Sequence, residues 1–148
     1  MTANLNVVLL GVIISIIFYE ITNISPGGII VPGLMAMYIT EPERIIYTLI
    51  VAIITYYLVK FISRYLIIFG KRKFVIMIIV SVVLNIILEL IIHAASINLI
   101  SVSLIGYTIA GLLAYNIDKQ GLKRTIPSFV IVMMIVELIV IVVNAIGA

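Results

Sequence analysis

Five long segments of this chain contain no Asp, Glu, Lys or Arg: residues 5–19, 21–40, 45–59, 74–88 and 94–117. A helix crosses the roughly 30 Å hydrocarbon layer of a bilayer with about 20 apolar residues. Of the 148 residues, 65% are hydrophobic and only 10% are charged, whereas soluble domains have about 25% charged residues. The sequence therefore predicts an integral membrane protein, with residues 1–148 forming a single membrane domain.

We expect an all-α polytopic membrane protein with about five transmembrane helices. The predicted spans are Leu5–Asn23, Ile45–Phe69, Phe74–Ile92, Ile97–Ile117 and Ile126–Ile146. Lys60 and Arg64 fall in the last third of the second span, where long basic side chains can reach the headgroup region.

Residues 25–39 are apolar but differ from these spans, because Ser25-Pro-Gly-Gly-Ile-Ile-Val-Pro-Gly33 contains two prolines and three glycines. Proline breaks an interior helical turn, and glycine permits a positive φ or a close backbone approach. Irregular backbone is tolerated at membrane depth only where protein or water satisfies its polar groups. We predict a broken segment that either re-enters or crosses, with a short half-helix starting at Pro32.

The basic residues predict the orientation of the chain. They gather in two turns, of which one contains Lys71, Arg72 and Lys73 and the other contains Lys119, Lys123 and Arg124. Both turns would be cytoplasmic if the span 97–117 crosses completely. The N-terminus would then be outside if the segment 25–39 crosses, and inside if it turns back.

A pattern Gly-Leu-x-Ala-x-x-Ile occurs twice, at residues 33–39 and 111–117. Each copy lies between two predicted long helices, as expected for a three-plus-three repeat with halves 1–70 and 71–148. In an inverted repeat the interrupted segments would meet near the midplane, as in many transport folds. A chance match between apolar sequences is the alternative.

Three acidic residues fall within or near the predicted spans, and acidic groups in a bilayer usually face protein or water. Glu20 and Glu89 lie near helix ends, whereas Glu137 is central. They could relay protons or contact a cation or an amine, or they could be structural partners of basic residues. His93 follows Glu89 by one helical turn, but two ligands are too few for a zinc site, so no metal site is predicted.

Small residues recur every four positions at Gly106, Ala110 and Ala114. Such a face lets another helix approach closely, which predicts helix packing within the chain or against a partner. No Walker A, GxGxxG or GxSxG motif occurs, so we expect no nucleotide site and no catalytic residues.

Three motifs, in their order and spacing, resemble the PgsC or CapC family, the small membrane subunit of bacterial poly-γ-glutamate synthase. They are Ser25-Pro-Gly-Gly28 with Ile29-Ile-Val-Pro-Gly33, Gly70-Lys-Arg-Lys-Phe74, and Asp118-Lys-Gln-Gly121. The resemblance extends over essentially the whole chain. Family members commonly carry a second proline–glycine pair where this chain has Ala110-Gly111.

The resemblance implies a multi-pass protein of the bacterial plasma membrane that helps make and export poly-γ-glutamate for a capsule. Its implied partners are an amide ligase of the PgsB or CapB type and subunits of the PgsA or CapA and PgsE or CapE types, together with the polymer and lipids but not nucleic acid. ATP and a divalent metal are expected on the ligase. This chain would bind no cofactor and would not be catalytic by itself.

On this hypothesis two groups of residues have roles. Candidates for the polymer pathway are Lys60, Arg64, Arg72, Gly27, Gly28, Pro32, Gly33 and Glu137. Candidates for docking the ligase are Lys71, Arg72, Lys73, Asp118, Lys119, Gln120 and Gly121. Free N–H groups near residues 28–34 would present the positive end of the half-helix to carboxylates.

An independent small transporter or channel is the alternative function, with the broken segment and Glu137 forming its pathway. The prolines and glycines could also only shape a tight turn, and the basic residues could only set the topology. A membrane-embedded hydrolase is a third class, for which the sequence offers no nucleophile arrangement.

Overall fold

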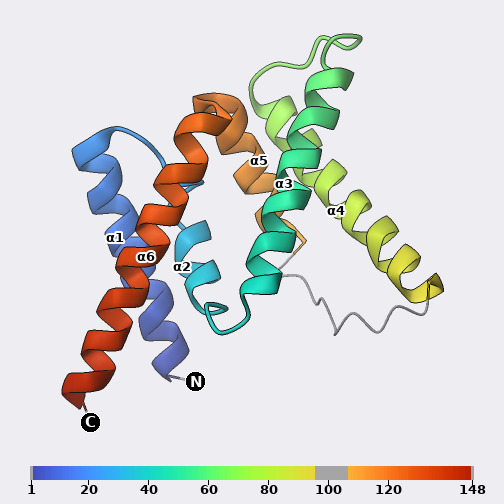
Figure 1. Ribbon diagram of the computed structural model, residues 1–148. Coiled ribbons are helices and arrows are strands. Elements are labelled where there is room, and N and C mark those ends of the chain that lie inside the picture. The colour runs from blue at the N-terminus through green and yellow to red at the C-terminus, as the bar shows by residue number, and fades with distance from the viewer. Residues whose placement is uncertain (1, 96–106, 148) are drawn as a thin grey trace. The chain divides into compact units, whose positions relative to one another are not determined.

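The protein is described here by a computed structural model, which covers residues 2–95 and 107–147, with side chains from Asn6 onward. These residues form six α-helices and no strand, so an all-α fold is confirmed for the described part of the chain (Figure 1). The helices are α1 (Thr2–Thr22), α2 (Val31–Ala36), α3 (Pro42–Ile62), α4 (Lys71–Ala94), α5 (Ile109–Gln120) and α6 (Leu122–Gly147).

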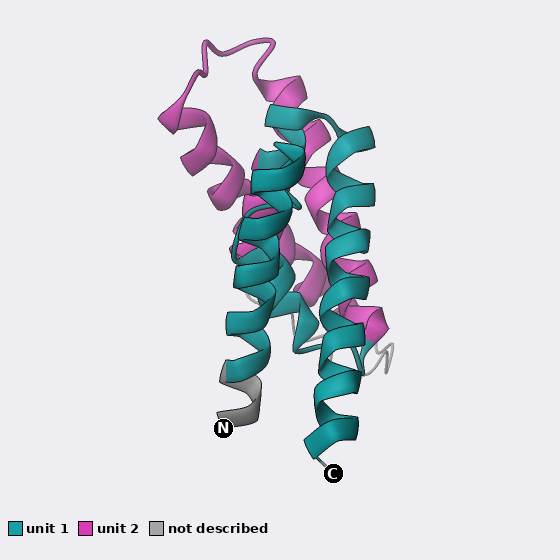
Figure 2. Cartoon of the chain, turned by 90° about the vertical axis from the view of Figure 1, so that its left-hand side faces the viewer, with its two compact units in different colours: residues 1–41, 116–148 teal, residues 42–115 magenta. Residues whose placement is uncertain are grey.

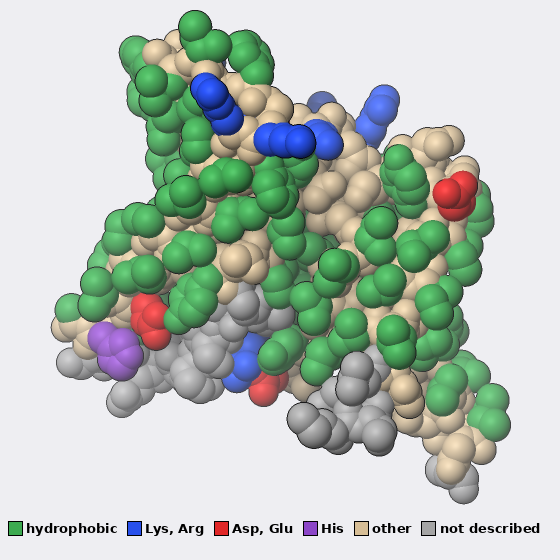
Figure 3. All heavy atoms as spheres, turned by 180° about the vertical axis from the view of Figure 1, so that it is seen from behind, with side chains coloured by type: hydrophobic (Ala, Val, Ile, Leu, Met, Phe, Trp, Pro, Cys, Tyr) green, Lys and Arg blue, Asp and Glu red, His purple; other side chains and the backbone are tan. Residues whose placement is uncertain are grey.

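Three helices, α3, α4 and α6, are long and apolar enough to cross a membrane, and Asn6–Thr22 of α1 is a shorter apolar helix. The number of five spans stays a prediction, because residues 97–106 of one predicted span lie outside the described residues. α5 begins at Ile109 and continues past Ile117 to Gln120. Hydrophobic side chains cover most of the visible face, and the basic ones stand out as a few separate groups (Figure 3).

The second predicted span is shorter in the structure than in the sequence interpretation. α3 begins at Pro42 and ends at Ile62, and a turn follows in which the Arg64 amide donates to the Phe61 carbonyl at 3.2 Å. Arg64 therefore lies in the connection between α3 and α4, whereas Lys60 lies in the last turn of α3.

The chain divides into two compact units (Figure 2). Unit 1 comprises residues 1–41 and 116–148, and unit 2 comprises residues 42–115. In unit 1, α1, α2 and α6 all pack against one another, and in unit 2, α3 packs against α4. Each unit thus combines helices from both predicted halves of the sequence, so the units do not coincide with residues 1–70 and 71–148.

Within unit 1, α1 and α2 meet at a pair of glycines. A Cβ atom added to Gly11 would overlap the Cα atom of Gly33, and one added to Gly33 would lie 2.7 Å from the Val8 carbonyl oxygen. Both glycines are buried. The short helix α2 begins at Val31, one residue before Pro32, and its Leu34 amide donates to the Ile30 carbonyl at 3.0 Å.

Within unit 2, Gly111 of α5 lies directly against α4. A Cβ atom added there would be 2.7 Å from Ser81 Oγ and 2.8 Å from the Ile78 Cα atom. Ala110 and Ala114 on the same helix are both 0% exposed. The predicted small-residue face is therefore buried at these two positions, and Gly106 lies outside the described residues.

Replacing Gly111 by Leu should destabilise the protein, because the α4 backbone leaves no room for a side chain. Overpacking of this kind typically costs about 1–3 kcal/mol. Gly147 is the matched control, since nothing lies within 4 Å of a Cβ atom added there. Thermal unfolding in detergent should show a lower Tm for Gly111→Leu and an unchanged Tm for Gly147→Leu. Equal Tm values would show that the close approach of α5 to α4 is absent.

Candidate functional site

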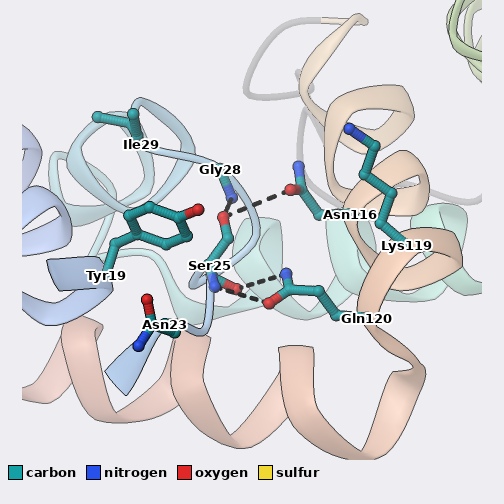
Figure 4. A pocket seen from close by; sticks show the side chains of 8 residues that line it. All are labelled: Tyr19, Asn23, Ser25, Gly28, Ile29, Asn116, Lys119 and Gln120. Atoms are coloured by element: carbon teal, nitrogen blue, oxygen red, sulfur yellow. Dashed lines mark hydrogen bonds between the residues drawn. The ribbon is translucent and has the colours of Figure 1, made fainter. Parts of the chain in front are cut away.

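The loop that follows α1 is held by the C-terminal end of α5, entirely within unit 1 (Figure 4). The Ser25 amide donates to Gln120 Oε1 at 2.7 Å, and Gln120 Nε2 donates back to the Ser25 carbonyl at 3.0 Å. One carboxamide therefore pairs with both backbone groups of one residue. The arrangement joins two motifs that lie 95 residues apart in the sequence.

Asn116, one helical turn before Gln120, holds the rest of the loop. Its Nδ2 donates to the Gly27 carbonyl at 3.0 Å, and its Oδ1 accepts from Ser25 Oγ at 3.4 Å. Ser25 Oγ in turn accepts from the Gly28 amide at 3.0 Å. We call the loop 25–28 with Asn116 and Gln120 the cradle.

The loop requires glycine for two reasons. Gly27 and Gly28 have φ values of 83° and 109°, which residues with a side chain rarely adopt. In addition, a Cβ atom on Gly28 would lie 3.2 Å from Asn116 Nδ2. A side chain at Gly28 would thus strain the loop and displace the carboxamide that holds it.

Gly121 places the cradle residues of α5 next to α6. Its φ is 89°, and its amide donates to the Ile117 carbonyl at 2.8 Å, as in a helix that ends in a left-handed residue. α6 starts at the next residue, Leu122. The buried Thr125 then donates from Oγ1 to the Gly121 carbonyl at 3.0 Å, which fixes the corner.

A cavity of about 470 Å³ opens beside the cradle, within the range of small-molecule sites. The Tyr19 hydroxyl points toward the loop (Figure 4). The cavity is lined by carboxamides, hydroxyl groups and one ammonium group, with no acidic side chain. The lining residues are Tyr19, Asn23, Ser25, Gly28, Ile29, Asn116, Lys119 and Gln120. Groups of this kind can bind carboxylates and amides.

The structure brings together only some of the residues singled out from the sequence. Gly28, Lys119 and Gln120 line the cavity, and Gly27 contributes its carbonyl to the cradle. Pro32 and Gly33 are buried away from the cavity, where Gly33 packs on α1. Glu137 is an exposed residue of α6 and is not among the residues that line the cavity.

The other candidates lie in or near the two basic turns. Lys71, Arg72 and Lys73 open α4 in unit 2. Lys60 Nζ donates to the Tyr56 hydroxyl at 3.2 Å and lies 5.4 Å from the centroid of that ring. Asp118 and Gly121 flank the cradle residues of α5 in sequence.

Two of the amides near residues 28–34 that the sequence predicts to be free, those of Gly28 and Leu34, donate within the chain. The amides of Gly27 and Gly28 donate to Ser25, and that of Leu34 donates to the Ile30 carbonyl. The reason is that the loop closes on itself and α2 forms its own first turn. Besides these backbone groups, three carboxamides are among the residues that line the cavity, those of Asn23, Asn116 and Gln120.

Asn116, Tyr19 and Asn23 were not singled out from the sequence. The available signal was the spacing of Asn116 and Gln120, since residues four apart share one helix face. Two carboxamides on one face at the end of an apolar helix indicate a polar contact that the helix itself does not need.

Glu89 and His93 lie near the C-terminal end of α4 and contact different surroundings. No group of three or more His, Cys, Asp or Glu side chains gathers in the described part of the chain. Glu89 instead accepts a hydrogen bond from the Tyr107 hydroxyl at 3.3 Å, and His93 is exposed in the last turn of α4.

The sequence matches a known protein family and two known relatives. Residues 10–126 match the family described as Capsule biosynthesis CapC. The chain is 36% identical over 121 residues to the PGA biosynthesis protein CapC of Bacillus subtilis (strain 168), covering 81% of each chain. It is 32% identical over 123 residues to the Capsule biosynthesis protein CapC of Bacillus anthracis, covering 82% of this chain and 83% of the relative. No solved structure matches it.

Proposed function

Because the chain belongs to the capsule biosynthesis CapC family, we propose that it is the membrane subunit of a poly-γ-glutamate synthase and export complex. A role in capsule or poly-γ-glutamate biosynthesis follows from its relatives. The proposal adds that this chain docks an ATP-dependent amide ligase at the cytoplasmic face and helps pass the polymer across the membrane.

The division of labour follows from the composition of the chain. Most of the described residues lie in helices, three of which are long and apolar enough to cross a membrane, so we assign the ATP and metal chemistry to the ligase. The basic turn at Lys71, Arg72 and Lys73 is the proposed contact for that ligase. Further membrane-anchored subunits of the CapA and CapE types would complete the complex in the plasma membrane.

The cradle supports a definite topology. It joins the end of α1 to the end of α5, next to the basic turn that contains Lys119 and Lys123. Because basic turns are cytoplasmic, the cradle lies at the cytoplasmic face and the N-terminus of α1 lies outside. Gly33 reaches Val8 and Val12, about 15–20 Å along α1 from its cytoplasmic end. The segment 25–39 therefore crosses the membrane in our proposal.

The same contacts support an inverted three-plus-three repeat. Gly33 packs on the middle of α1, and Gly111 packs on α4 around Ile78. Both glycines begin the sequence pattern that occurs twice. In the proposed topology α1 runs inward and α4 runs outward, so the two halves would have opposite orientations.

The cysteine-free chain allows a direct test of this topology, because native thiols give no background. A cysteine at Lys71 should resist a membrane-impermeant thiol reagent added to intact cells, whereas one at Thr2 should react. Breaking the cells open should make the Lys71→Cys variant react as well. Labelling of Lys71→Cys in intact cells would reverse the orientation and move the cradle outside.

The single observation that carries the polymer role is the cavity beside the cradle. γ-Linked polyglutamate has a free carboxylate on every residue and an amide in every link. Lys119 and the carboxamides of Asn23, Asn116 and Gln120 line the cavity and offer complementary groups. We propose that a polymer segment occupies this cavity at the cytoplasmic face. Independently of where the two units lie, we propose that Lys60, Arg64 and Arg72 attract the polyanion to that face.

Neutralising Lys60 or Arg64 tests the attraction of the polymer separately from assembly. Each single change to Gln should lower the surface polymer several-fold, because a cation at the cytoplasmic face raises the local concentration of a polyanion there. The ligase should still co-purify with each variant. If the amount of surface polymer falls only in variants that lose the ligase, the basic residues serve docking alone. If the wild-type chain retains no ligase, an independent transporter is favoured.

A further inference from the structure

One face of α6 carries a stripe of exposed residues spaced four, three, four and three apart. This spacing keeps side chains on one seam of a helix, as in packed helix pairs. Val130, Met134 and Ile141 in this stripe are 42%, 65% and 60% exposed. We call the stripe the α6 seam, and it consists of Val130, Met134, Glu137, Ile141 and Asn144, all of them exposed.

The seam holds both polar side chains of the C-terminal half of α6, Glu137 and Asn144. Glu137 lies thirteen residues after Arg124, about 20 Å along the helix axis from the cytoplasmic end, which is well inside the hydrocarbon layer. Asn144 lies two turns further on the same face. The buried face of α6 is separate and contains Thr125, Ser128, Phe129, Val132, Met133 and Val136.

Glu137 has no hydrogen bond or ion pair with the residues that the structure describes. A carboxylate exposed to lipid at this depth is costly, and acidic groups in membranes usually pair or face protein. The neighbouring side chains Met134 and Ile141 cannot pair with it. Among the described residues, Glu137 therefore has no partner for its carboxylate at this depth.

We propose that the α6 seam is the docking surface for a transmembrane helix of another subunit, which places a Lys or Arg side chain against Glu137. The inference rests on the proposed function in so far as the partner belongs to the same complex. The apolar seam residues supply the packing surface, and the ion pair fixes the register of the two helices, as a polar seam residue does in a coiled coil.

Charge decides between the candidate occupants. A second copy of this chain packed seam to seam about a two-fold axis near Glu137 would bring two carboxylates together, which is unfavourable. Lipid tails offer neither a cation nor a hydrogen-bond donor. A basic side chain offers both a cation and a hydrogen-bond donor, and an Arg can donate two parallel hydrogen bonds to the carboxylate.

Photo-crosslinking in the complete complex tests the seam. Ile141 and Val142 are adjacent and both exposed, at 60% and 45%, but they point about 100° apart around the helix. A photo-reactive amino acid at Ile141 should capture a membrane subunit of the complex that mass spectrometry finds to have Lys or Arg within its spanning helix. The same probe at Val142 should capture at least tenfold less.

Changes at Glu137 complete the test. Glu137→Leu should insert well, yet lower the capture from Ile141 at least tenfold, whereas Glu137→Asp should retain it. Capture of a second copy, capture of lipid only, equal capture from Val142, or capture unaffected by Glu137→Leu would each overturn the inference. Co-purification of the ligase is measured in the same samples. If the ligase is retained and no subunit is captured, only the seam inference fails. If the wild-type chain retains no ligase, the proposed function itself is refuted.

Discussion

Replacing Gly33 by Leu is expected to abolish accumulation of folded protein. The backbones of α1 and α2 approach so closely that a Cβ atom on Gly33 would lie 2.7 Å from the Val8 carbonyl oxygen and 3.2 Å from the Val12 amide nitrogen. These are backbone atoms of a helix and cannot move aside as a flexible side chain can. The cost should exceed the roughly 1–3 kcal/mol typical of overpacking, because α1 and α2 would have to separate.

The measurement is the yield of monodisperse protein by size-exclusion chromatography of a fluorescent fusion. Gly11→Leu should fail in the same way, since Gly11 is the other half of the contact. Gly147→Leu should behave like the wild type. A normal yield of Gly33→Leu would mean that α2 does not pack on α1 as described, and the proposed crossing of segment 25–39 would lose its support.

The double change Asn116→Leu with Gln120→Leu is expected to lower surface polymer at least tenfold while the protein still folds. The change removes the side chains that pair with Ser25 and Gly27. Each unpaired polar group in a partly buried site costs about 1–3 kcal/mol, so the loop should leave its present conformation. The core of unit 1, where α1, α2 and α6 pack together, does not depend on these carboxamides.

Asn6→Leu is the matched control, because it removes an exposed carboxamide of α1 that is not among the residues lining the cavity. Folded yield, ligase co-purification and surface polymer should be measured for both variants. Normal polymer in the double variant would show that the cradle has no part in polymer handling. Loss of both the ligase and the polymer in the double variant would mean that the cradle serves assembly of the complex and does not contact the polymer.

The sequence alone is sufficient to predict helices, because these depend on long apolar segments and on individual prolines. Charge-free segments predict long apolar helices, of which α3, α4 and α6 are long and apolar enough to cross a membrane. The proline at position 32 predicts the short helix that begins one residue earlier at Val31. The end of α3 was placed too late, at Phe69 instead of Ile62. Hydropathy continues through the turn after α3, so composition alone could not locate that end.

The candidate site was harder to predict, because it depends on pairing between distant segments. The sequence predicts different roles for the two motifs of the cradle, the polymer pathway for one and docking of the ligase for the other. Nothing in local sequence shows that Gln120 would pair with the backbone of Ser25. The sequence likewise suggests a polymer contact for Gly33, because its close packing against Gly11 depends on how α1 and α2 pair in space.

Crosslinking of the polymer itself tests the central proposal most directly. A photo-reactive amino acid at Asn23, which lines the cavity, should become attached to γ-linked polyglutamate when the complete complex is synthesising polymer. The same group at Asn6 should not. Loss of the Asn23 adduct in the Asn116→Leu, Gln120→Leu background would tie it to the cradle. Polymer synthesis without any adduct at Asn23, or with equal adducts at both positions, would contradict the proposal that the polymer enters through this cavity.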